Sequence, residues 1–240
     1  MFKAILFDLD GTLLPMDNNQ FIAEYLKILG AYMQKYLEPV KFIEHLNLST
    51  TAMLSNKEDD KTNEEVFVEN FFQHPAFEEE KILPVFEKFY ETEFPKLKRY
   101  TRYSDLIPKI LAEVNKKGFS LVVATNPVFP EIAIKQRLEW AGLVDLPFEL
   151  ITTYENMHFC KPSLQYYLEI SDMLKIEPEK CLMVGNDAGE DMAAKAAGMS
   201  TFLVEDCIIM PENILWEPDY RGSLEQFYSF IIKLPDREEG

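Results

Sequence analysis

Short apolar runs recur along the chain at intervals that suit a parallel β-sheet. The runs cover residues 2–7, 119–124, 148–152, 181–184 and 201–204. Runs of this length, apolar at nearly every position, are typical of strands that are buried on both faces of a parallel sheet. Helical periodicity between the later runs supplies the connections of βαβ units. The pattern therefore predicts an α/β fold, with a Rossmann-like parallel sheet core flanked by helices.

A long helical segment interrupts this alternation after the first strand. Residues 17–99 carry apolar side chains at helical spacing. Pro39 suits the first turn of a second helix, and Thr62 with Glu65 three residues later forms a capping-box signature. We expect helices at about 18–37, from 39, from 62 and at 77–94. The segment predicts an all-helical cap, residues 17–99, inserted into an α/β core formed by residues 1–16 and 100–240.

The helices of the second half are predicted from their periodicity and from their stop signals. Gly198 ends an alanine-rich segment from Glu190 to Ala197, which we expect to form a short helix. The run at 201–204 is expected to be the last strand, and a helix near 224–232 closes the chain. Other helices are expected at about 104–116, 130–141 and 163–174.

The charge balance narrows the class of partners. The chain has 240 residues, of which 47% are hydrophobic and 27% charged, as in ordinary globular proteins. It carries 24 Lys and Arg against 41 Asp and Glu, a formal net charge of −17. Because contacts with phosphate backbones depend on Lys and Arg, we expect no nucleic-acid partner, and no membrane partner either. Three cysteines without CxxC spacing favour reduced thiols in a cytoplasmic protein.

Three of the predicted strands end in residues that can carry chemistry. In a parallel sheet the carboxyl ends of the strands share one edge, and ligands bind outside it. Lys161, followed by Pro162, lies in the loop before a helix. The residues after the strands are Asp8 with Asp10, Thr125 with Asn126, and Asp187 followed by Asp191. Oxygen donors of this kind, without a cysteine or histidine cluster, suit Mg²⁺, which shares its ligands with phosphate.

The order of these residues resembles the four motifs of the haloacid dehalogenase-like (HAD) hydrolases. The motifs are matched by Asp8-Leu9-Asp10-Gly11-Thr12, by Thr125 after an apolar strand, by Lys161-Pro162, and by Gly185-Asn186-Asp187 with Asp191 four residues further on. The resemblance covers about residues 1–16 and 100–210. It implies a phosphatase-branch enzyme in which the helical insert, between the first and second motifs, is a C1-type cap.

The first motif carries the central roles that the resemblance implies. Asp8 would be the nucleophile and a metal ligand. Asp10 would act as general acid and then as general base, and its backbone carbonyl would bind the metal. A carboxylate nucleophile divides hydrolysis into two steps through an aspartyl-phosphate. Asp10 also separates this pattern from the dehalogenase branch of the family, which lacks that residue.

The second and third motifs imply residues that bind the phosphoryl group. Thr125, with Asn126 close by, would donate hydrogen bonds to it. Lys161 would neutralise charge on the nucleophile and on the phosphate. Phosphoryl transfer depends on positioning and charge neutralisation more than on covalent chemistry, which agrees with these roles.

The fourth motif departs from the common pattern at one position. Asp187 and Asp191 would complete the Mg²⁺ site. Asn186 stands between Gly185 and Asp187, where many relatives place an aspartate directly after the glycine. The sequence therefore leaves open which of the two aspartates contacts the metal.

These expectations predict a Mg²⁺-dependent phosphatase that hydrolyses a small phosphorylated metabolite. Two alternatives stay open. A phosphomutase or other phosphotransferase would use the same site to pass the phosphoryl group to an acceptor other than water. A binding protein could keep the fold without turnover, although the complete set of acidic and lysine positions disfavours it. The sequence does not name the substrate, because specificity is expected in the cap.

Overall fold

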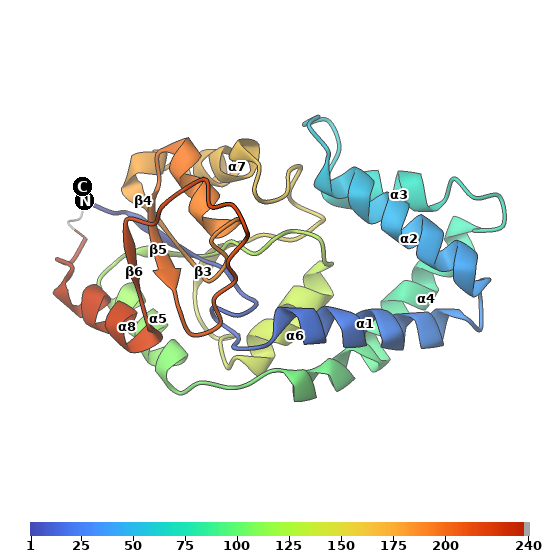
Figure 1. Cartoon of the computed structure of the whole chain (residues 1–240), viewed down its shortest axis with the longest axis horizontal. Helices are drawn as coiled ribbons and strands as arrows, with labels where there is room; N and C mark the ends of the chain where they lie inside the picture. The colour runs from blue at the N-terminus through green and yellow to red at the C-terminus, as the bar shows by residue number, and fades with distance from the viewer. Residues whose placement is uncertain (238–240) are drawn as a thin grey trace.

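A six-stranded, all-parallel β-sheet forms the centre of the protein. The computed structural model describes residues 1–237, and its sheet has the strand order β3-β2-β1-β4-β5-β6 (Figure 1). The strands are β1 (Ala4–Phe7), β2 (Ser120–Val123), β3 (Phe148–Ile151), β4 (Cys181–Gly185), β5 (Ser200–Val204) and β6 (Tyr220–Gly222). This sheet, with helices on both of its faces, confirms the predicted Rossmann-like α/β core.

The central strand β1 ends at the same level as its two neighbours, β2 and β4. Phe7 pairs with Val123 of β2 on one side and with Val184 of β4 on the other. All four residues of β1 are buried, as their apolar run predicts. Because the three strands are parallel and end at one level, the residues that follow them emerge at the same edge of the sheet.

Alternate residues of β1 pack into two different cores, one on each face of the sheet. Ile5 and Phe7 belong to the larger core, and Ala4 and Leu6 to the smaller one. The larger core is covered by α5 (Leu106–Lys116), α6 (Glu131–Trp140) and α8 (Leu224–Lys233). The smaller core is covered by α7 (Leu164–Leu174) and the 3₁₀ helix η3 (Asp191–Ala197).

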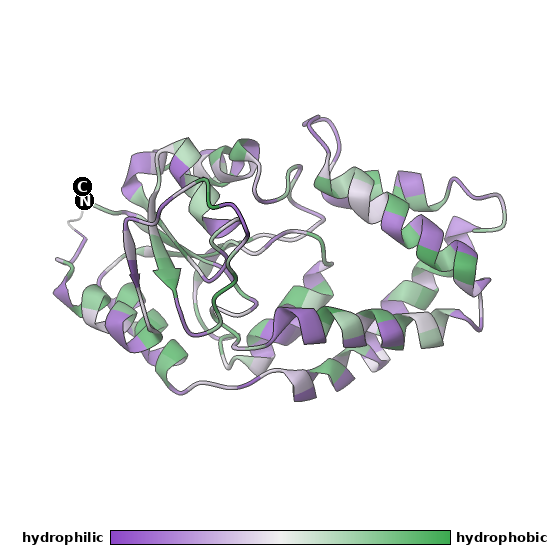
Figure 2. Ribbon diagram, in the orientation of Figure 1, coloured by the Kyte–Doolittle hydropathy of each residue, from purple (hydrophilic) through white to green (hydrophobic). Residues whose placement is uncertain are grey.

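Four helices form a lobe beside the sheet, and all of them lie between β1 and β2 in the sequence. They are α1 (Asn18–Met33), α2 (Pro39–Leu54), α3 (Asn63–Phe71) and α4 (Glu79–Thr92). α1 begins beside the sheet and extends away from it, and α2 and α3 lie across the lobe from α1 (Figure 1). Hydrophobic and hydrophilic positions alternate around these helices (Figure 2), so each can bury one side. Within residues 1–237, no helix is both long and apolar enough to cross a lipid bilayer.

Aromatic side chains join the helical lobe to the core. Phe94 lies in the 3₁₀ helix η1 (Phe94–Tyr100) and stacks on Trp140 of α6, with ring centroids 5.6 Å apart. Tyr25 of α1 packs edge-to-face against Phe129, which precedes α6, at a centroid distance of 5.1 Å. The lobe therefore reaches the carboxyl edge of the sheet through α1 and the loop before α6.

The structure confirms the capping box at the start of α3 and the short alanine-rich helix, and it corrects the position of the last strand. The strand at 200–204 is not the last one, because β6 follows it; only Gly222 of β6 is buried, so no apolar pattern reveals this strand. The alanine-rich segment forms the 3₁₀ helix η3, whose start is held by a hydrogen bond from the Asp191 N–H to the Asp187 carbonyl. Residues 94–100 form η1, where the sequence pattern predicts no separate element.

Candidate active site

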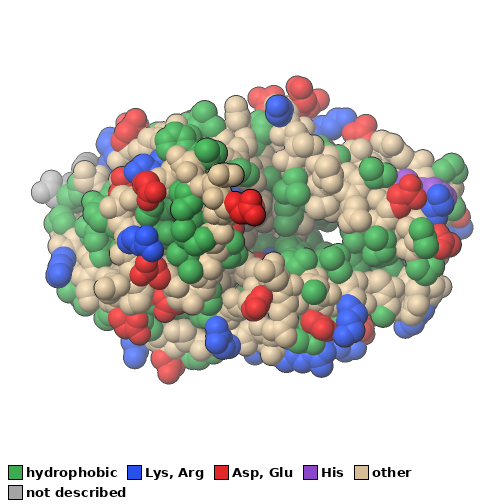
Figure 3. Space-filling model, viewed as in Figure 1, with side chains coloured by type: hydrophobic (Ala, Val, Ile, Leu, Met, Phe, Trp, Pro, Cys, Tyr) green, Lys and Arg blue, Asp and Glu red, His purple; other side chains and the backbone are tan. Residues whose placement is uncertain are grey.

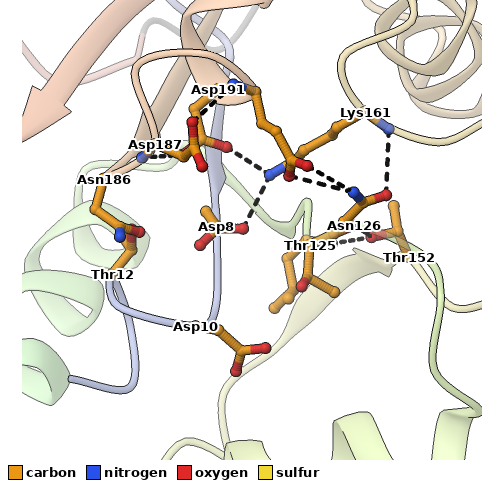
Figure 4. A network of polar contacts seen from close by, with 12 residues as sticks. Asp8, Asp10, Thr12, Thr125, Asn126, Thr152, Lys161, Asn186, Asp187 and Asp191 are labelled. Carbon is orange, nitrogen blue, oxygen red and sulfur yellow. Dashed lines mark hydrogen bonds and ion pairs between the residues drawn. The ribbon is translucent and has the colours of Figure 1, made fainter. Parts of the chain in front are cut away.

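The predicted site residues converge at the carboxyl edge of the sheet. One cavity of about 230 Å³ opens there. Lys161 is almost fully buried, and its ammonium reaches toward Asp8 and Asp191 (Figure 4). The other predicted residues all line the cavity: Asp8, Asp10, Thr125, Asn126, Asp187 and Asp191. The structure thus brings together side chains from four separate parts of the chain.

The Lys161 ammonium joins two carboxylates at the centre of the site. Its Nζ lies 2.9 Å from Asp8 Oδ1 and 2.6 Å from Asp191 Oδ1. Burial by itself would lower the pKa of Lys161, but the two carboxylates outweigh burial and hold that pKa well above its ordinary value. Lys161 is therefore a permanent positive charge next to the predicted nucleophile.

The carboxylate of Asp10 takes a different direction and pairs with an arginine. Figure 4 shows it turned away from the cluster around Lys161. Its Oδ2 accepts a hydrogen bond from Nη1 of Arg137, whose side chain is fully buried in α6. Burial raises the pKa of Asp10, and the Arg137 charge opposes that rise. Asp10 Oδ1 and Arg137 Nη2 are both buried and have no hydrogen-bond partner among residues 1–237.

Sequence reasoning missed Arg137, although a signal for it exists. Arg137 occupies the buried face of α6, next to Ala133, Ile134 and Leu138. Its Nε donates to the Ala133 carbonyl at 3.2 Å, and its guanidinium lies 4.5 Å from the centre of the Phe129 ring. A charged residue on an apolar helical face is almost never fully buried unless it is paired. That position alone could have marked Arg137 as the partner of a buried acid.

The loop after β4 is tied together by its own aspartates. Asp187 Oδ1 accepts hydrogen bonds from the N–H groups of Gly189 (2.8 Å) and Glu190 (3.0 Å). Asp191 Oδ2 accepts one from the Asp187 N–H at 2.9 Å. A Cβ atom at Gly185 would overlap the Asp191 carboxylate, so this position needs glycine. Both oxygens of Asp191 are therefore engaged, whereas the hydrogen bonds of Asp187 use only Oδ1.

Asn186, the residue that departs from the family pattern, has a structural role. Its Oδ1 accepts a hydrogen bond from the Thr12 hydroxyl at 2.8 Å, and its Nδ2 donates to the Cys207 carbonyl at 2.7 Å. Gly11 has φ +93°, and a side chain there would collide with Asn186. The amide thus locks the turn after β1 to the loop after β4.

Thr125 and Asn126 are held differently. The Thr125 carbonyl accepts hydrogen bonds from the hydroxyls of Tyr166 and Thr152, both at 2.8 Å, which fixes the backbone and leaves the Thr125 hydroxyl facing the cavity. Asn126 Oδ1 accepts from the Lys161 N–H at 3.2 Å, and Nδ2 donates to Glu190. Asn126 also lines the cavity, and its expected contact with the phosphate stays a prediction.

Glu190 is a second residue that sequence reasoning missed. It lines the cavity, and burial is the main reason why its pKa rises to about 7. Lys161 opposes the rise, and the nearby Asp191, Asp187 and Asp8 add to it. Glu190 lies between Asp187 and Asp191 in the sequence, and this position could have marked it as a residue of the site.

The donor set fits a hard divalent cation. The cavity is lined by several carboxylates and, within residues 1–237, by no cationic side chain. Burial raises the pKa of Asp191 to about 7, as expected where carboxylates crowd without enough positive charge. No three Asp, Glu, His or Cys side chains of the described residues are arranged to hold a metal by themselves. Mg²⁺ suits such a site, because it usually takes one or two carboxylates and keeps several waters.

Comparison with known proteins identifies the class. Residues 2–198 match the haloacid dehalogenase-like hydrolases, so the chain belongs to this family. The phosphoglycolate phosphatase of Aquifex aeolicus (strain VF5) is 32% identical over 206 residues, which cover 84% of each chain. Pyrophosphatase PpaX of Bacillus velezensis is 26% identical over 218 residues, 90% of each chain.

Solved structures agree with this assignment. The crystal structure of a HAD phosphatase from Thermococcus onnurineus has a TM-score of 0.62 at 19% identity and covers 98% of this chain and 100% of its own. That likeness shows a shared fold. The family match and the phosphatase relatives place the chain among the phosphatases of this family.

Proposed function

We propose that this enzyme is a Mg²⁺-dependent phosphatase that hydrolyses a small phosphomonoester through an aspartyl-phosphate on Asp8. The observation that carries the proposal is the contact of Lys161 Nζ with both Asp8 and Asp191, at the end of the central strand. A buried lysine beside a carboxylate at this edge neutralises the negative charge that would otherwise repel a phosphate. Asp10, two residues further on, supplies a second acid.

In the first step, the Asp8 oxygen that is not bound to Lys161 attacks phosphorus. The bond between phosphorus and the ester oxygen breaks, and the protonated Asp10 carboxyl gives its proton to the leaving oxygen. The raised pKa of Asp10 favours the protonated form that this step needs. In the structure this carboxylate pairs with Arg137, so its side chain turns toward the substrate before it donates.

In the second step, water attacks the aspartyl-phosphate. Asp10 takes the proton from this water, phosphate leaves, and Asp8 is free again. Lys161 keeps its charge throughout and stabilises the oxygens of the phosphoryl group. The Thr125 hydroxyl faces the cavity from a backbone that Tyr166 and Thr152 hold, so it is placed to donate a hydrogen bond to the same group.

Asp8, the Asp10 carbonyl and Asp187 would hold the Mg²⁺ ion, which supplies charge neutralisation for the phosphoryl group when it is bound. Asp187 is the better candidate for a direct ligand, because both oxygens of Asp191 are already engaged by Lys161 and by a backbone N–H. Asp191 then acts by holding Lys161. This assignment follows from the hydrogen bonds of the two aspartates.

We further propose that residues 17–99 form a cap that closes over the site and selects substrates, on a core formed by residues 1–16 and 100–240. α1 begins directly after the loop that bears Asp10, and Asn18 and Ile22 of α1 line the site. Lid closure excludes water and typically takes microseconds to milliseconds. The net charge of −17 and the reduced cysteines support a cytoplasmic location.

The test is to trap the intermediate. With p-nitrophenyl phosphate and Mg²⁺, Asp10→Asn should still form the aspartyl-phosphate and hydrolyse it slowly, because this leaving group needs little protonation. Mass spectrometry of acid-quenched protein should then find the phosphate on the peptide that contains Asp8. Phosphate on another residue, or full activity after exhaustive EDTA treatment, would contradict the proposal. Transfer of the phosphoryl group to an added alcohol in preference to water would favour a phosphotransferase.

A further inference from the structure

A second cavity adjoins the site and has a very different lining. It also measures about 230 Å³ and lies between the four helices of the lobe and the loop before α6. Its walls are mostly aliphatic and aromatic, with Tyr25 and Leu26 from α1, Leu46 from α2, Phe67 from α3 and Phe86 from α4. Figure 3 shows the molecule hollowed at this place, with hydrophobic side chains around the opening.

The two cavities are contiguous. Ile22 of α1, with Val128 and Phe129 of the loop before α6, line both of them. Phe129 also carries the Arg137 guanidinium on its ring, and Arg137 pairs with Asp10. A phosphate ester bound at Asp8 therefore has its organic part next to the second cavity.

The second cavity is electrically neutral. None of the residues that line it within the described part of the chain is charged. The hydroxyls of Tyr25 and Tyr90 satisfy each other at 2.9 Å. The other polar side chains of the lining are also neutral: Asn47, Thr50 and Tyr154. The two buried cations nearby, Lys161 and Arg137, are already bound to carboxylates of the catalytic site. Nothing in the lining can therefore balance a negative charge on a bound molecule.

Two side chains of α1 are exposed although they are apolar. Ile22 is 41% exposed and Leu26 is 38% exposed, and their spacing puts them on one face of the helix, toward the cavity. An apolar wall of this kind, kept open to solvent beside a catalytic site, is typical of a ligand pocket with few polar groups. It can be covered by the apolar part of a substrate.

We propose that the substrate is a phosphomonoester whose leaving group is a neutral aromatic or branched aliphatic alcohol. This inference rests on the proposed phosphatase function and names its substrate class. An apolar cavity of about 150 Å³ accepts benzene, so the volume here admits a single aromatic ring with substituents. A carboxylate or a second phosphate would lose much of its hydration without gaining a cationic partner, because the lining offers only neutral donors such as Asn47 and Thr50. The chain should therefore differ in specificity from enzymes that act on phosphoglycolate or pyrophosphate.

The first experiment ranks substrates of the wild-type enzyme with Mg²⁺. Hydrolysis of benzyl phosphate by water would give benzyl alcohol and inorganic phosphate. The leaving groups of benzyl phosphate and phosphoglycolate are both primary alcohols, so the two substrates differ mainly in the group that the cavity would bind. We expect kcat/KM for benzyl phosphate to exceed that for phosphoglycolate and for pyrophosphate by about 10- to 100-fold, the range for burying one apolar group of this size. An equal or reversed ranking would overturn the inference and leave the phosphatase proposal standing.

The second experiment places a charge in the cavity. Thr50 of α2 lines it, so Thr50→Lys should lower kcat/KM for benzyl phosphate and raise that for phosphoglycolate, each by roughly tenfold. Leu48→Lys is the matched control, because Leu48 belongs to the same helix, is exposed and does not line the cavity. The control should keep the wild-type ranking. A Thr50→Lys enzyme that is active with unchanged ranking would count against the inference.

A binding measurement separates the two proposals. Calorimetry of the wild-type protein with Mg²⁺ should show tighter binding of benzylphosphonate than of phosphonoacetate, by about 10-fold or more. If no phosphomonoester is hydrolysed but this preference holds, the phosphatase proposal fails and the assignment of the cavity stands. If phosphonoacetate binds as well as benzylphosphonate, the assignment of the cavity is wrong.

Discussion

Two cavities of about the same volume share one wall in this protein, and their linings are opposite in character. The cavity at the sheet edge is lined by carboxylates, whereas the one under the helical lobe is lined by neutral, mostly apolar side chains. The acidic residues follow two strands of the sheet, β1 and β4, whereas most of the apolar residues stand on helices of the lobe. The two proposals therefore give catalysis and substrate selection to different parts of the chain.

The two cavities also differ in how strongly their side chains are held in place. In the acidic cavity, Lys161 fixes the carboxylates of Asp8 and Asp191. In the apolar cavity few polar contacts are made, so shape and neutrality decide what fits. Changes in the first cavity should therefore affect the reaction and the pH dependence of stability, and changes in the second should alter substrate choice. Four predictions test this difference, from the largest effect to the smallest.

The largest effect is expected from Asp8→Asn. This change removes the proposed nucleophile, so kcat with p-nitrophenyl phosphate should fall by about 10⁴-fold or more, as for other nucleophiles. Asp10→Asn should lose about 10²–10⁴-fold, the usual contribution of a general acid–base group. Steady-state kinetics checks both. Asp145→Asn, at an exposed position, serves as the control and should match the wild type. Near-normal turnover by Asp8→Asn would disprove the assignment of the nucleophile.

The second largest effect is expected on stability, from a change at Arg137, which packs against the Phe129 ring that lines both cavities. Arg137→Ala would leave the Asp10 carboxylate buried without its partner and should lower the free energy of unfolding by about 3–5 kcal/mol. Urea denaturation measures this change. Arg221→Ala is the control, since the exposed pair of Arg221 with Glu205 should contribute only about 0–1 kcal/mol.

A double-mutant cycle sharpens this test. In an Asp10→Asn background the buried charge is gone, so Arg137→Ala should cost clearly less than it does in the wild type. Arg137→Lys should recover part of the stability. Equal costs in both backgrounds would mean that Arg137 acts through packing alone.

A smaller effect should appear in the pH dependence of stability of the metal-free protein. Burial raises the pKa of Glu190 from 4.5 to about 7, so this residue favours the folded state below pH 4.5 and loses that contribution as the pH rises through 7. Glu190→Gln should therefore be more stable than the wild type by about 2–3 kcal/mol at pH 8, and equally stable at pH 4. Urea denaturation in EDTA at the two pH values measures this.

The exposed Glu212 supplies the control for this measurement. Glu212→Gln should follow the wild type at both pH values. If Glu190→Gln showed the same stability difference at pH 4 and pH 8, the ionisation of Glu190 would not be its cause.

The smallest effect is expected in the apolar cavity. Tyr90→Phe leaves the buried Tyr25 hydroxyl without its partner and should cost about 1 kcal/mol of stability. The value of kcat for p-nitrophenyl phosphate should stay within about twofold, because no charge of the catalytic site changes. Thermal unfolding and kinetics test both statements, with the exposed Tyr103→Phe as the control. A loss of kcat comparable to that of Asp10→Asn would erase the distinction between the two cavities.

The sequence by itself determined the features that depend on short segments. The buried strands, the capping box at Thr62 and Glu65, and the positions of Asp8 and Asp10 follow from local periodicity and local hydrogen bonding. The convergence of the strand ends also followed, because parallel strands must share a carboxyl edge. Residues on such an edge can be predicted without coordinates.

Only the tertiary structure decided which side chains meet across the chain. Arg137 and Asp10 are 127 residues apart, and Thr12 and Asn186 are 174 apart, so no local pattern couples them. The strand β6 and the neutral lining of the second cavity escaped prediction for the same reason. An edge strand needs a neighbouring strand to form its hydrogen bonds, and a helical aromatic residue can face either the core or a cavity. Tertiary packing decides which of these arrangements forms, because the free energy of burial depends on what each side chain contacts and not on its place in the sequence.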